Sequence, residues 1–237
     1  MWSEIKENLS FVLVCIAIIA LLGLIAWLAE RYLLRSRKVS SARKVAVIGL
    51  CAAVATILHL LDFPLSFLAP GFYKLDFSEV PVMLCGFYLG PSSVVFCEGL
   101  KVLLKLLLKG TDTAFVGDFA NFATGCSLAL PAVIVYHINK TRKSAIWGLF
   151  TGTFFLTAFG SAFNGIYLIP KFAQLYGLPL DTIIGMGSAI NGKIDSLFTF
   201  VLFAVAPLNL IKGVLVSGLT LLLYKRVGKF LFSKMIS

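Results

Sequence analysis

Apolar stretches long enough to cross a lipid bilayer recur along almost the whole chain, and they restrict its fold more than any other feature of the sequence. A stretch of roughly 18 or more apolar residues can cross a hydrocarbon core of about 30 Å as an α-helix. With 59% hydrophobic residues, 14% charged residues and a mean hydropathy of +0.95, the chain is too apolar for a water-soluble domain of this size. The sequence therefore predicts an all-α integral membrane protein.

The formal net charge is +10, and the positions of the basic residues indicate how the helices are oriented. Such a charge would suggest nucleic-acid binding in a soluble protein, but in a membrane protein Lys and Arg gather in cytoplasmic loops. We therefore expect no nucleic-acid partner, an N-terminus outside the bacterial cell membrane and a C-terminus in the cytoplasm. The basic residues between predicted spans form three main clusters: Arg31, Arg35, Arg37, Lys38, Arg43 and Lys44; Lys140, Arg142 and Lys143; Lys225, Arg226, Lys229 and Lys234.

The apolar runs predict an N-terminal anchor helix followed by a core of six spans. The first span is residues 8–29, within an anchor of residues 1–35; its basic residues follow the apolar run, which is the reverse of a secretory signal peptide. Residues 36–44 are predicted to be a basic cytoplasmic linker, and residues 45–237 a six-helix domain. The six spans expected in that domain cover about residues 45–61, 76–90, 92–109, 119–138, 145–168 and 207–224.

Proline and glycine mark the connections that are expected on the outer side. Residues 64–74 predict an ordered loop, and Asp76 with Glu79 has the spacing of a capping box at the start of the next span. Residues 170–196 predict a long external connection, because proline and glycine interrupt them repeatedly. Pro207 is expected to begin the last span, since proline suits the first turn of a helix.

Ionisable side chains inside the predicted spans are the first candidates for binding chemistry, because they are costly to place in a bilayer. Glu98, Lys101 and Lys105 lie on one predicted span, with Glu98 and Lys101 one helical turn apart. Either an ion pair on the helix face or a lysine that reaches toward the membrane surface accounts for them.

Four further polar residues lie near the outer ends of spans. Asp118 is a candidate N-cap, and Asn121 then lies one turn inside its helix, where a carboxamide needs a partner. Asn164 lies about a turn and a half from the outer end of its span. Lys212 is the strongest candidate, because the residues on either side of it are apolar and give its ammonium group no easy path to water.

The sequence contains no enzyme or metal signature that we can identify. HExxH, GxSxG and P-loop motifs are absent from it. The five cysteines lie in apolar runs without a CxxC pair, and His59 and His137 lie near opposite ends of spans. We expect a protein that is not an enzyme and that holds no metal or cofactor.

An ordered set of short motifs resembles the riboflavin-binding S components of energy-coupling factor (ECF) transporters. The resemblance covers about residues 43–232, and the order of the motifs makes it specific. In that family, a six-helix S component captures the vitamin outside, and two ATPases with a transmembrane coupling protein power its release inside. The motifs are Leu75-Asp76-Phe77-Ser78-Glu79-Val80-Pro81, Gly90-Pro91, Lys101, Gly117-Asp118-Phe119-Ala120-Asn121-Phe122, Asn164 and Pro207-Leu208-Asn209-Leu210-Ile211-Lys212-Gly213.

The resemblance implies riboflavin as the transported ligand and a set of residues that bind it. Asn164 and Lys212 would hold the ring system, with the loop of residues 64–77 closing over it. A carboxamide suits the imide edge of a flavin, because it can both donate and accept hydrogen bonds. The substrate-binding residues expected on this basis are Asn164, Lys212, Asp76, Phe77, Ser78, Asp118, Asn121 and Asn209.

The resemblance also implies a surface for the coupling protein. The first core helix of the family often carries an Ala-xxx-Ala motif, where this chain has Gly49 and Ala53 at the same spacing. Small side chains four residues apart let helices approach closely, either with a partner or within this chain. Family members usually lack a helix like residues 8–29, and that is a further departure.

Other functions stay open from the sequence alone. An S component for thiamine, folate or pantothenate would share the architecture. A non-transporting membrane scaffold that holds a flavin or a partner is a second alternative, which the extra N-terminal helix keeps open. An integral membrane enzyme is the third.

Overall fold

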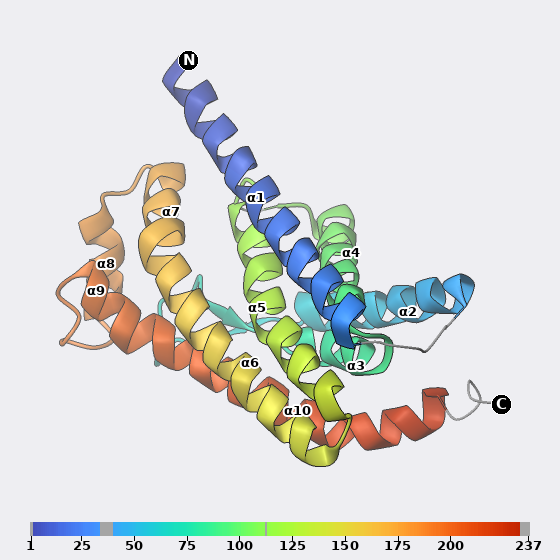
Figure 1. Ribbon diagram of the computed structural model, residues 1–237. Helices are drawn as coiled ribbons and strands as arrows, with labels where there is room; N and C mark the ends of the chain where they lie inside the picture. Colours follow the sequence, from blue (N-terminus) through green and yellow to red (C-terminus); the bar gives the residue numbers. More distant parts are fainter. Residues whose placement is uncertain (1, 34–39, 112, 233–237) are drawn as a thin grey trace.

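The computed structural model describes residues 2–33, 40–111 and 113–232, and helices dominate it (Figure 1). Two elements, η1 and η2, are π-helical turns that join their neighbours into the continuous helices α6–η1–α7 and α9–η2–α10. The elements are α1 (Trp2–Leu33), α2 (Ser41–Leu60), β1 (Phe63–Pro64), β2 (Lys74–Leu75), α3 (Glu79–Leu89), α4 (Pro91–Lys109), α5 (Val116–Asn139), α6 (Arg142–Phe163), η1 (Asn164–Leu168), α7 (Ile169–Tyr176), α8 (Leu180–Ser188), α9 (Leu197–Phe200), η2 (Val201–Val205) and α10 (Ala206–Phe232).

The membrane-spanning core consists of α2 to α6 and α10. α3 has only 11 residues, and α4 carries Glu98 and three lysines among its 19 residues; both pack against the longer helices of the bundle. The prediction of an all-α membrane protein with a six-helix core and an extra N-terminal helix is confirmed. In the described part of the chain, five helical stretches are long and apolar enough to cross a membrane: Phe11–Leu33, Ser41–Leu60, Val116–Asn139, Arg142–Tyr176 and Leu197–Arg226.

Glycines let α6 pack closely against its neighbours. A Cβ atom added at Gly152 would overlap the carbonyl oxygen of Leu128 on α5, and Gly148 makes the same kind of contact one turn earlier. On α10, Gly213 lies against the side chain of Thr153. Because lipid tails are as apolar as the helices, close packing of this kind is what holds a membrane bundle together.

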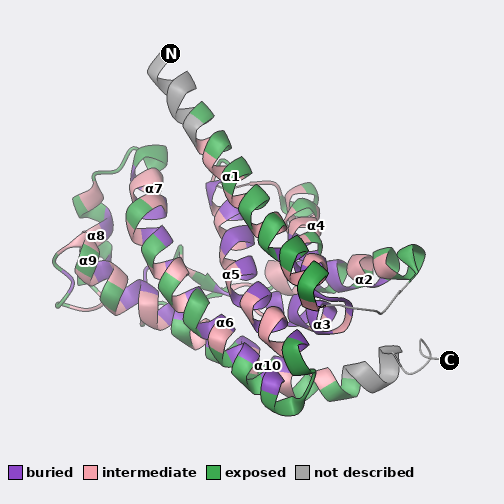
Figure 2. Ribbon diagram, in the orientation of Figure 1, coloured by how far each residue is buried: buried purple, intermediate pink, exposed green. Residues whose placement is uncertain are grey.

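α1 lies along the outside of the bundle, against α4 and α5 (Figure 2). Among its described side chains, Ala26 is the one that is buried, so most of the helix faces lipid. The Phe11 ring packs against Phe119 of α5 with a centroid distance of 6.2 Å. Near the other end of α1, Glu30 pairs with Lys44 of α2 at 3.4 Å.

A cap with its own hydrophobic core covers one end of the bundle. We define the cap as residues 63–75 and 169–200, so it contains β1, β2 and the helices α7, α8 and α9 at the left of Figure 1. The helix from Arg142 to Tyr176 has 35 residues, roughly 50 Å at 1.5 Å per residue, and therefore extends beyond a core of about 30 Å. The buried residues of the cap core are Ala69, Ile169, Ala173, Ile183, Ile194 and Phe200, which pack with Ala204 and Val205 of η2.

Two predicted helix boundaries at prolines are wrong. The helices continue through Pro170 and Pro207, so the predicted external connection is partly helical and the last span begins before Pro207. In each case a π turn begins six residues before the proline, at Asn164 and at Val201. The wider turn accommodates the missing N–H group and the ring clash that proline causes inside an α-helix.

Other boundaries differ by a few residues. α2 begins at Ser41, so it includes part of the predicted linker, whereas residues 34–39 lie outside the described residues. α5 begins at Val116 rather than near Phe119. The loop of residues 64–74 is ordered and not helical, as predicted, and its two ends pair as an antiparallel ladder.

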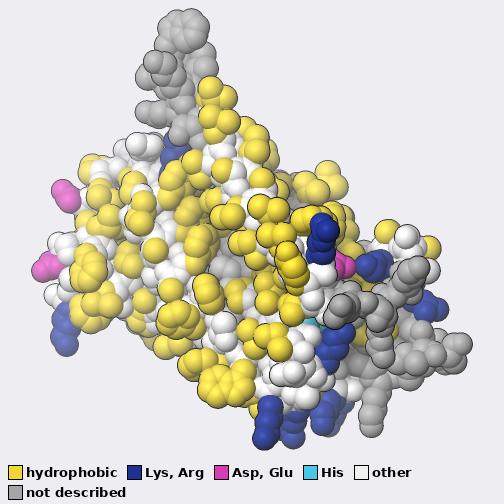
Figure 3. Space-filling view, viewed as in Figure 1, with side chains coloured by type: hydrophobic (Ala, Val, Ile, Leu, Met, Phe, Trp, Pro, Cys, Tyr) yellow, Lys and Arg dark blue, Asp and Glu magenta, His cyan; other side chains and the backbone are white. Residues whose placement is uncertain are grey.

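The described residues of the three basic clusters lie at the α1–α2 junction, at the α5–α6 junction and on α10 at Lys225 and Arg226, whereas Arg35, Arg37, Lys38 and Lys234 lie outside the described residues. Figure 3 shows a largely hydrophobic face, with most of its Lys and Arg side chains along the lower and right-hand edges and others at the left. The cap lies toward the opposite side in Figure 1. This one-sided distribution is what the positive-inside interpretation requires.

Candidate ligand-binding site

Five charged side chains form an ion-pair network inside the bundle. Lys101 Nζ lies 2.6 Å from Glu98 Oε2 and 3.5 Å from Glu79 Oε1. Lys212 Nζ lies 3.1 Å from the same Glu79 oxygen and 3.2 Å from Asp76 Oδ2. Asp76, Glu79, Glu98 and Lys101 are at most 3% exposed, so these charges are compensated mainly by one another.

The network joins elements that are far apart in the sequence. Glu98 and Lys101 are three residues apart on α4, and their contact confirms the ion pair that was one of two explanations from the sequence. Glu79 is the first residue of α3, and Lys212 comes from α10, 133 residues later. A change at any one of these side chains would therefore be felt by three helices.

The N-terminus of α3 is not capped as predicted, because the acidic residues Asp76 and Glu79 pair with lysines of the ion-pair network. Ser78, not Asp76, is the N-cap residue, and Asp76 Oδ1 accepts the Ser78 backbone N–H at 2.8 Å in a turn of the Asx type. The Ser78 hydroxyl accepts a hydrogen bond from Lys101 Nζ at 3.1 Å. The predicted capping box of Asp76 and Glu79 is wrong, because both carboxylates pair with lysines. Between them, the half-buried Phe77 packs on the core of the bundle.

Carboxylates outnumber lysines in the network. Asp76 also has His59 Nδ1 of α2 as a neighbour at 3.4 Å. Glu79 Oε2 and Glu98 Oε1 are buried and have no hydrogen-bond partner among the described residues. A buried acceptor without a donor is costly, so these oxygens are suited to accept hydrogen bonds from the hydroxyl groups of a ligand.

Two asparagines meet at Gly160 of α6. Asn164, the first residue of η1, donates from Nδ2 to the Gly160 carbonyl at 2.7 Å. Asn209 of α10 faces the same glycine, where an added Cβ would lie 2.8 Å from its Nδ2. That Nδ2 is buried and without a hydrogen-bond partner in the described structure. The α6–α10 contact therefore brings two predicted site residues together, whereas Lys212, three residues after Asn209 on α10, reaches Asp76 and Glu79 at the start of α3.

Tyr73 connects the cap to this group. Its hydroxyl donates to Asn164 Oδ1 at 2.8 Å, so both ends of the Asn164 carboxamide have partners. Burial raises the pKa of the Tyr73 phenol, which therefore stays protonated and remains a donor. The Tyr73 ring also packs against Phe200 with a centroid distance of 6.3 Å. The loop that was predicted to close over the site thus reaches Asn164.

Asp118 belongs to a second polar cluster, between α4 and α5. Lys105 Nζ donates to Asp118 Oδ1, and the Thr111 hydroxyl donates to Oδ2, each at 2.6 Å. Asp118 is the third residue of α5, so its prediction as an N-cap is wrong. Asn121 lies one turn further along, and its Oδ1 is buried with no hydrogen-bond partner among the residues described. The structure does not bring Asp118 into the ion-pair network.

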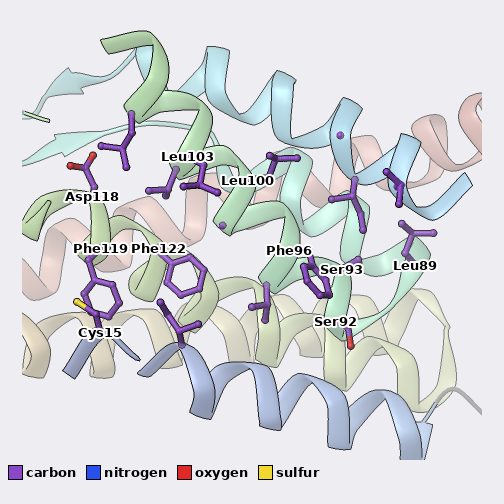
Figure 4. Close-up of a pocket in the computed structure, with 18 of the residues that line it drawn as sticks. Cys15, Leu89, Ser92, Ser93, Phe96, Leu100, Leu103, Asp118, Phe119 and Phe122 are labelled. Atoms are coloured by element: carbon purple, nitrogen blue, oxygen red, sulfur yellow. The ribbon is translucent and has the colours of Figure 1, made fainter. Parts of the chain in front are cut away.

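A cavity of about 1000 Å³ lies apart from the network, between α1, α2, α4 and α5 (Figure 4). Its walls are mostly apolar side chains such as Phe96 and Leu103, and the polar residues that border it are Glu30, Ser41, Lys44, Ser92, Ser93 and Asp118. Lys212 does not line it. The ion-pair network concentrates more charged groups than this cavity, so the polar groups of a ligand would find more partners in the network.

Sequence reasoning names Glu98 and Lys101 as candidates, because they are charged residues in a predicted span, but its set of ligand-binding residues omits both, and it also omits Glu79 and His59. Glu79 carries a similar signal, since it is a charged residue at the start of an apolar helix. His59 carries no such signal, because it lies near the end of its span.

A membrane bundle with a buried polar network, covered at one end by a cap, defines a class of protein that binds a polar small molecule within the membrane. Comparison with known proteins identifies the particular family. The sequence model of the family described as "ECF transporter, substrate-specific component" matches residues 43–224. The chain therefore belongs to the substrate-specific components of ECF transporters, which are transport proteins and not enzymes. It is a multi-pass protein of the bacterial cell membrane, and α1 precedes the matched region.

Relatives and a solved structure cover most of the chain. Riboflavin transporter RibU of Staphylococcus aureus (strain TCH60) is 33% identical over 197 residues, which is 83% of this chain and 96% of the relative. Riboflavin transporter FmnP of Bacillus subtilis (strain 168) is 27% identical over 176 residues, 74% and 86% of the two chains. The solved structure described as "Structure and mechanism of the S component of a bacterial ECF transporter" is 31% identical with a TM-score of 0.65, over 81% of this chain and 99% of the other.

Proposed function

We propose that this chain is the riboflavin-binding subunit of an ECF-type importer. It captures the vitamin at the outer face and delivers it inward with a transmembrane coupling protein and two ATPases. The observation that carries this proposal is the meeting of Asn164 and Asn209 at Gly160, one turn of α10 from the buried ion pairs of Lys212, in a chain that is 33% identical to a riboflavin transporter.

These residues supply what each part of riboflavin needs. The imide edge of the ring presents an acceptor, a donor and an acceptor, and the Asn164 carboxamide can answer both kinds of group. The Lys212 ammonium stabilises the electron-rich carbonyl edge, and the ribityl hydroxyls donate to the unpartnered oxygens of Glu79 and Glu98. The proposed contacts also include Asp76, Phe77, Ser78, Asn121 and Asn209. Asp118 would join them if the ligand displaced the hydroxyl of Thr111 from its carboxylate.

Titration of riboflavin into purified variants, followed by quenching of flavin fluorescence, tests this site. Removing a buried hydrogen-bond partner costs about 1–3 kcal/mol, so Lys212→Ala and Asn164→Ala should each weaken binding by about tenfold to a hundredfold. Lys193→Ala, which removes an exposed lysine of the cap, should leave the affinity unchanged. Unaltered affinity in both site variants would rule out the site.

Competition experiments distinguish the alternatives. Excess thiamine, folate or pantothenate should leave bound riboflavin in place, and displacement by one of them would instead indicate an S component for that vitamin. Copurification with the coupling protein and the ATPases is expected for an importer. A scaffold would bind flavin but would not associate with these subunits.

We also propose that Gly49 and Ala53 of α2 contact the coupling protein. Ala53 is exposed, and Gly49 borders the cavity between α1, α2, α4 and α5, where an added Cβ would meet no described atom within 4 Å, so packing within this chain closes off neither residue. Ala53→Trp should therefore leave riboflavin binding intact and abolish uptake into cells. Val54→Trp, at an exposed position on another face of α2, should change neither. If Ala53→Trp spares uptake or also removes binding, the coupling role is wrong.

A further inference from the structure

The cap is attached to the bundle in a way that allows it to move as one body. Its buried residues form a cluster separate from the two clusters inside the bundle. The chain passes between cap and bundle through η1 and η2, which contact each other, and through the two ends of the loop of residues 63–75. The apolar contacts between cap and bundle that a tilt of the cap would change are mainly those of the cap core with Ala204 and Val205 of η2 and of Phe172 with the cluster that contains Phe163.

The two π turns, η1 and η2, lie side by side, so the long helices α6–η1–α7 and α9–η2–α10 can bend at the same height in the bundle. In η1 the Ile169 N–H bonds to the Asn164 carbonyl, and in η2 the Ala206 N–H bonds to the Val201 carbonyl, each five residues back. Both turns are followed by a proline at the same spacing. Prolines and π turns are the places where helices kink, so one bend axis can serve both helices.

Tyr73 makes a hydrogen bond across this bend level. Its ring belongs to the cap, and its hydroxyl reaches Asn164 Oδ1 at the bundle end of η1 at 2.8 Å. Asn164 is only 6% exposed, so water competes poorly for this bond. The ion pair of Lys74 with Asp62, 3.2 Å long and exposed, also links the loop to the end of α2 but contributes little.

We propose that Tyr73 is the latch of the cap and the positioning residue for Asn164. While its bond is made, the cap stays down and the Asn164 carboxamide is fixed with Oδ1 toward Tyr73 and Nδ2 toward Gly160. The second lone pair of Oδ1 and the second N–H of Nδ2 then remain for a ligand. Only the statement that this ligand is riboflavin rests on the proposed function.

Tyr73→Phe tests the latch because it removes the hydroxyl and keeps the ring. The cap should open about fivefold more often, which corresponds to about 1 kcal/mol for one buried hydrogen bond. Because riboflavin passes the cap in both directions, its association rate, measured by stopped-flow fluorescence, should rise about fivefold. Its dissociation rate should rise by at least as much, because the Asn164 carboxamide also loses its positioning hydrogen bond. A rise in the dissociation rate alone would mean that Tyr73 merely touches the ligand, and would overturn the latch.

Hydrogen exchange of the purified protein without added vitamin gives a second test that does not depend on the ligand. In Tyr73→Phe, amides of residues 63–75 and 177–192 should exchange about fivefold faster, while amides of residues 125–138 in α5 keep their rates. Tyr176→Phe, at an exposed tyrosine of the cap, is the matched control and should change neither. Unchanged exchange in the cap, or equal acceleration everywhere, would refute the proposal. Expected exchange without riboflavin binding would refute the proposed function instead.

Discussion

At the scale of single residues, Lys101 is the side chain on which the interior charge balance depends most. Its ammonium group is fully buried and contacts Glu98, Glu79 and the Ser78 hydroxyl. Such a network contributes little net stability, because the cost of removing the charges from water offsets their attraction. Removing one partner is different, since it leaves the opposite charge buried without compensation.

Lys101→Met should therefore destabilise the protein by about 3–5 kcal/mol. Adding Glu98→Gln, which removes the stranded charge, should restore most of that loss. Lys109→Met, at an exposed position on the same helix, should change little. Thermal unfolding can be followed with a thiol-reactive dye, because Cys85, Cys97 and Cys126 are buried until the bundle opens. A Lys101→Met protein that unfolds at the original temperature would contradict this account of the network.

The sequence locates these charges but not their partners. The contact between Glu98 and Lys101 could be foreseen, because residues three apart share a face of a helix. The pairing of Lys212 with Asp76 joins residues 136 positions apart, and no local pattern encodes it. Lys212, Asn164 and Asn209 could be named from motifs, whereas the meeting of the two asparagines at Gly160 depends on how α6 packs against α10.

At the scale of elements, the helices were predictable wherever an apolar run ends at charged residues, as for α2 and α4. The prediction failed at Pro170 and Pro207, because a proline commonly marks a helix end and the sequence gives no sign that a π turn will accommodate it. Through these two turns α6 continues into α7, and α9 continues into α10. The helices of the cap are therefore extensions of two helices of the bundle.

The contact between α5 and α6 leads to a prediction at this scale. A Cβ at Gly152 would meet the Leu128 carbonyl oxygen, which belongs to the backbone and cannot move aside. Gly152→Ala should therefore destabilise the bundle by about 1–3 kcal/mol. Gly218→Ala is the control, since no described atom outside α10 lies within 4 Å of its added Cβ; there the substitution should be neutral or slightly stabilising. Equal melting temperatures for both variants would show that this contact is not tight.

At the scale of the whole molecule, all three basic clusters lie at one side, and the cap lies toward the other. A single inverted helix would break this arrangement. It supports an orientation in which the cap faces the outside, where the vitamin is captured, and the basic ends face the cytoplasm. α1 then crosses the membrane as an anchor with its N-terminus outside.

Labelling in intact cells tests this orientation. A membrane-impermeant maleimide should react with Asp181→Cys in α8, an exposed position of the cap. It should not react with Lys143→Cys, at the α5–α6 junction, until the cells are permeabilised. The native cysteines are buried or half-buried, so the unmodified chain gives the background signal. Reaction of Lys143→Cys from outside would invert the topology.

The charges of α4 also bear on how the nascent chain enters the membrane. Charged side chains at the centre of an isolated helix cost about 2.5–3.5 kcal/mol each on insertion, and α4 does not rank among the described helices that are apolar enough to insert alone. Glu79, which pairs with Lys101 of α4, is translated with α3 just before α4, whereas Lys212 is translated last. Asp76 and Glu79 therefore lack their contacts with Lys212 until α10 is translated, and a chain interrupted before that helix would hold three carboxylates of the network against a single lysine.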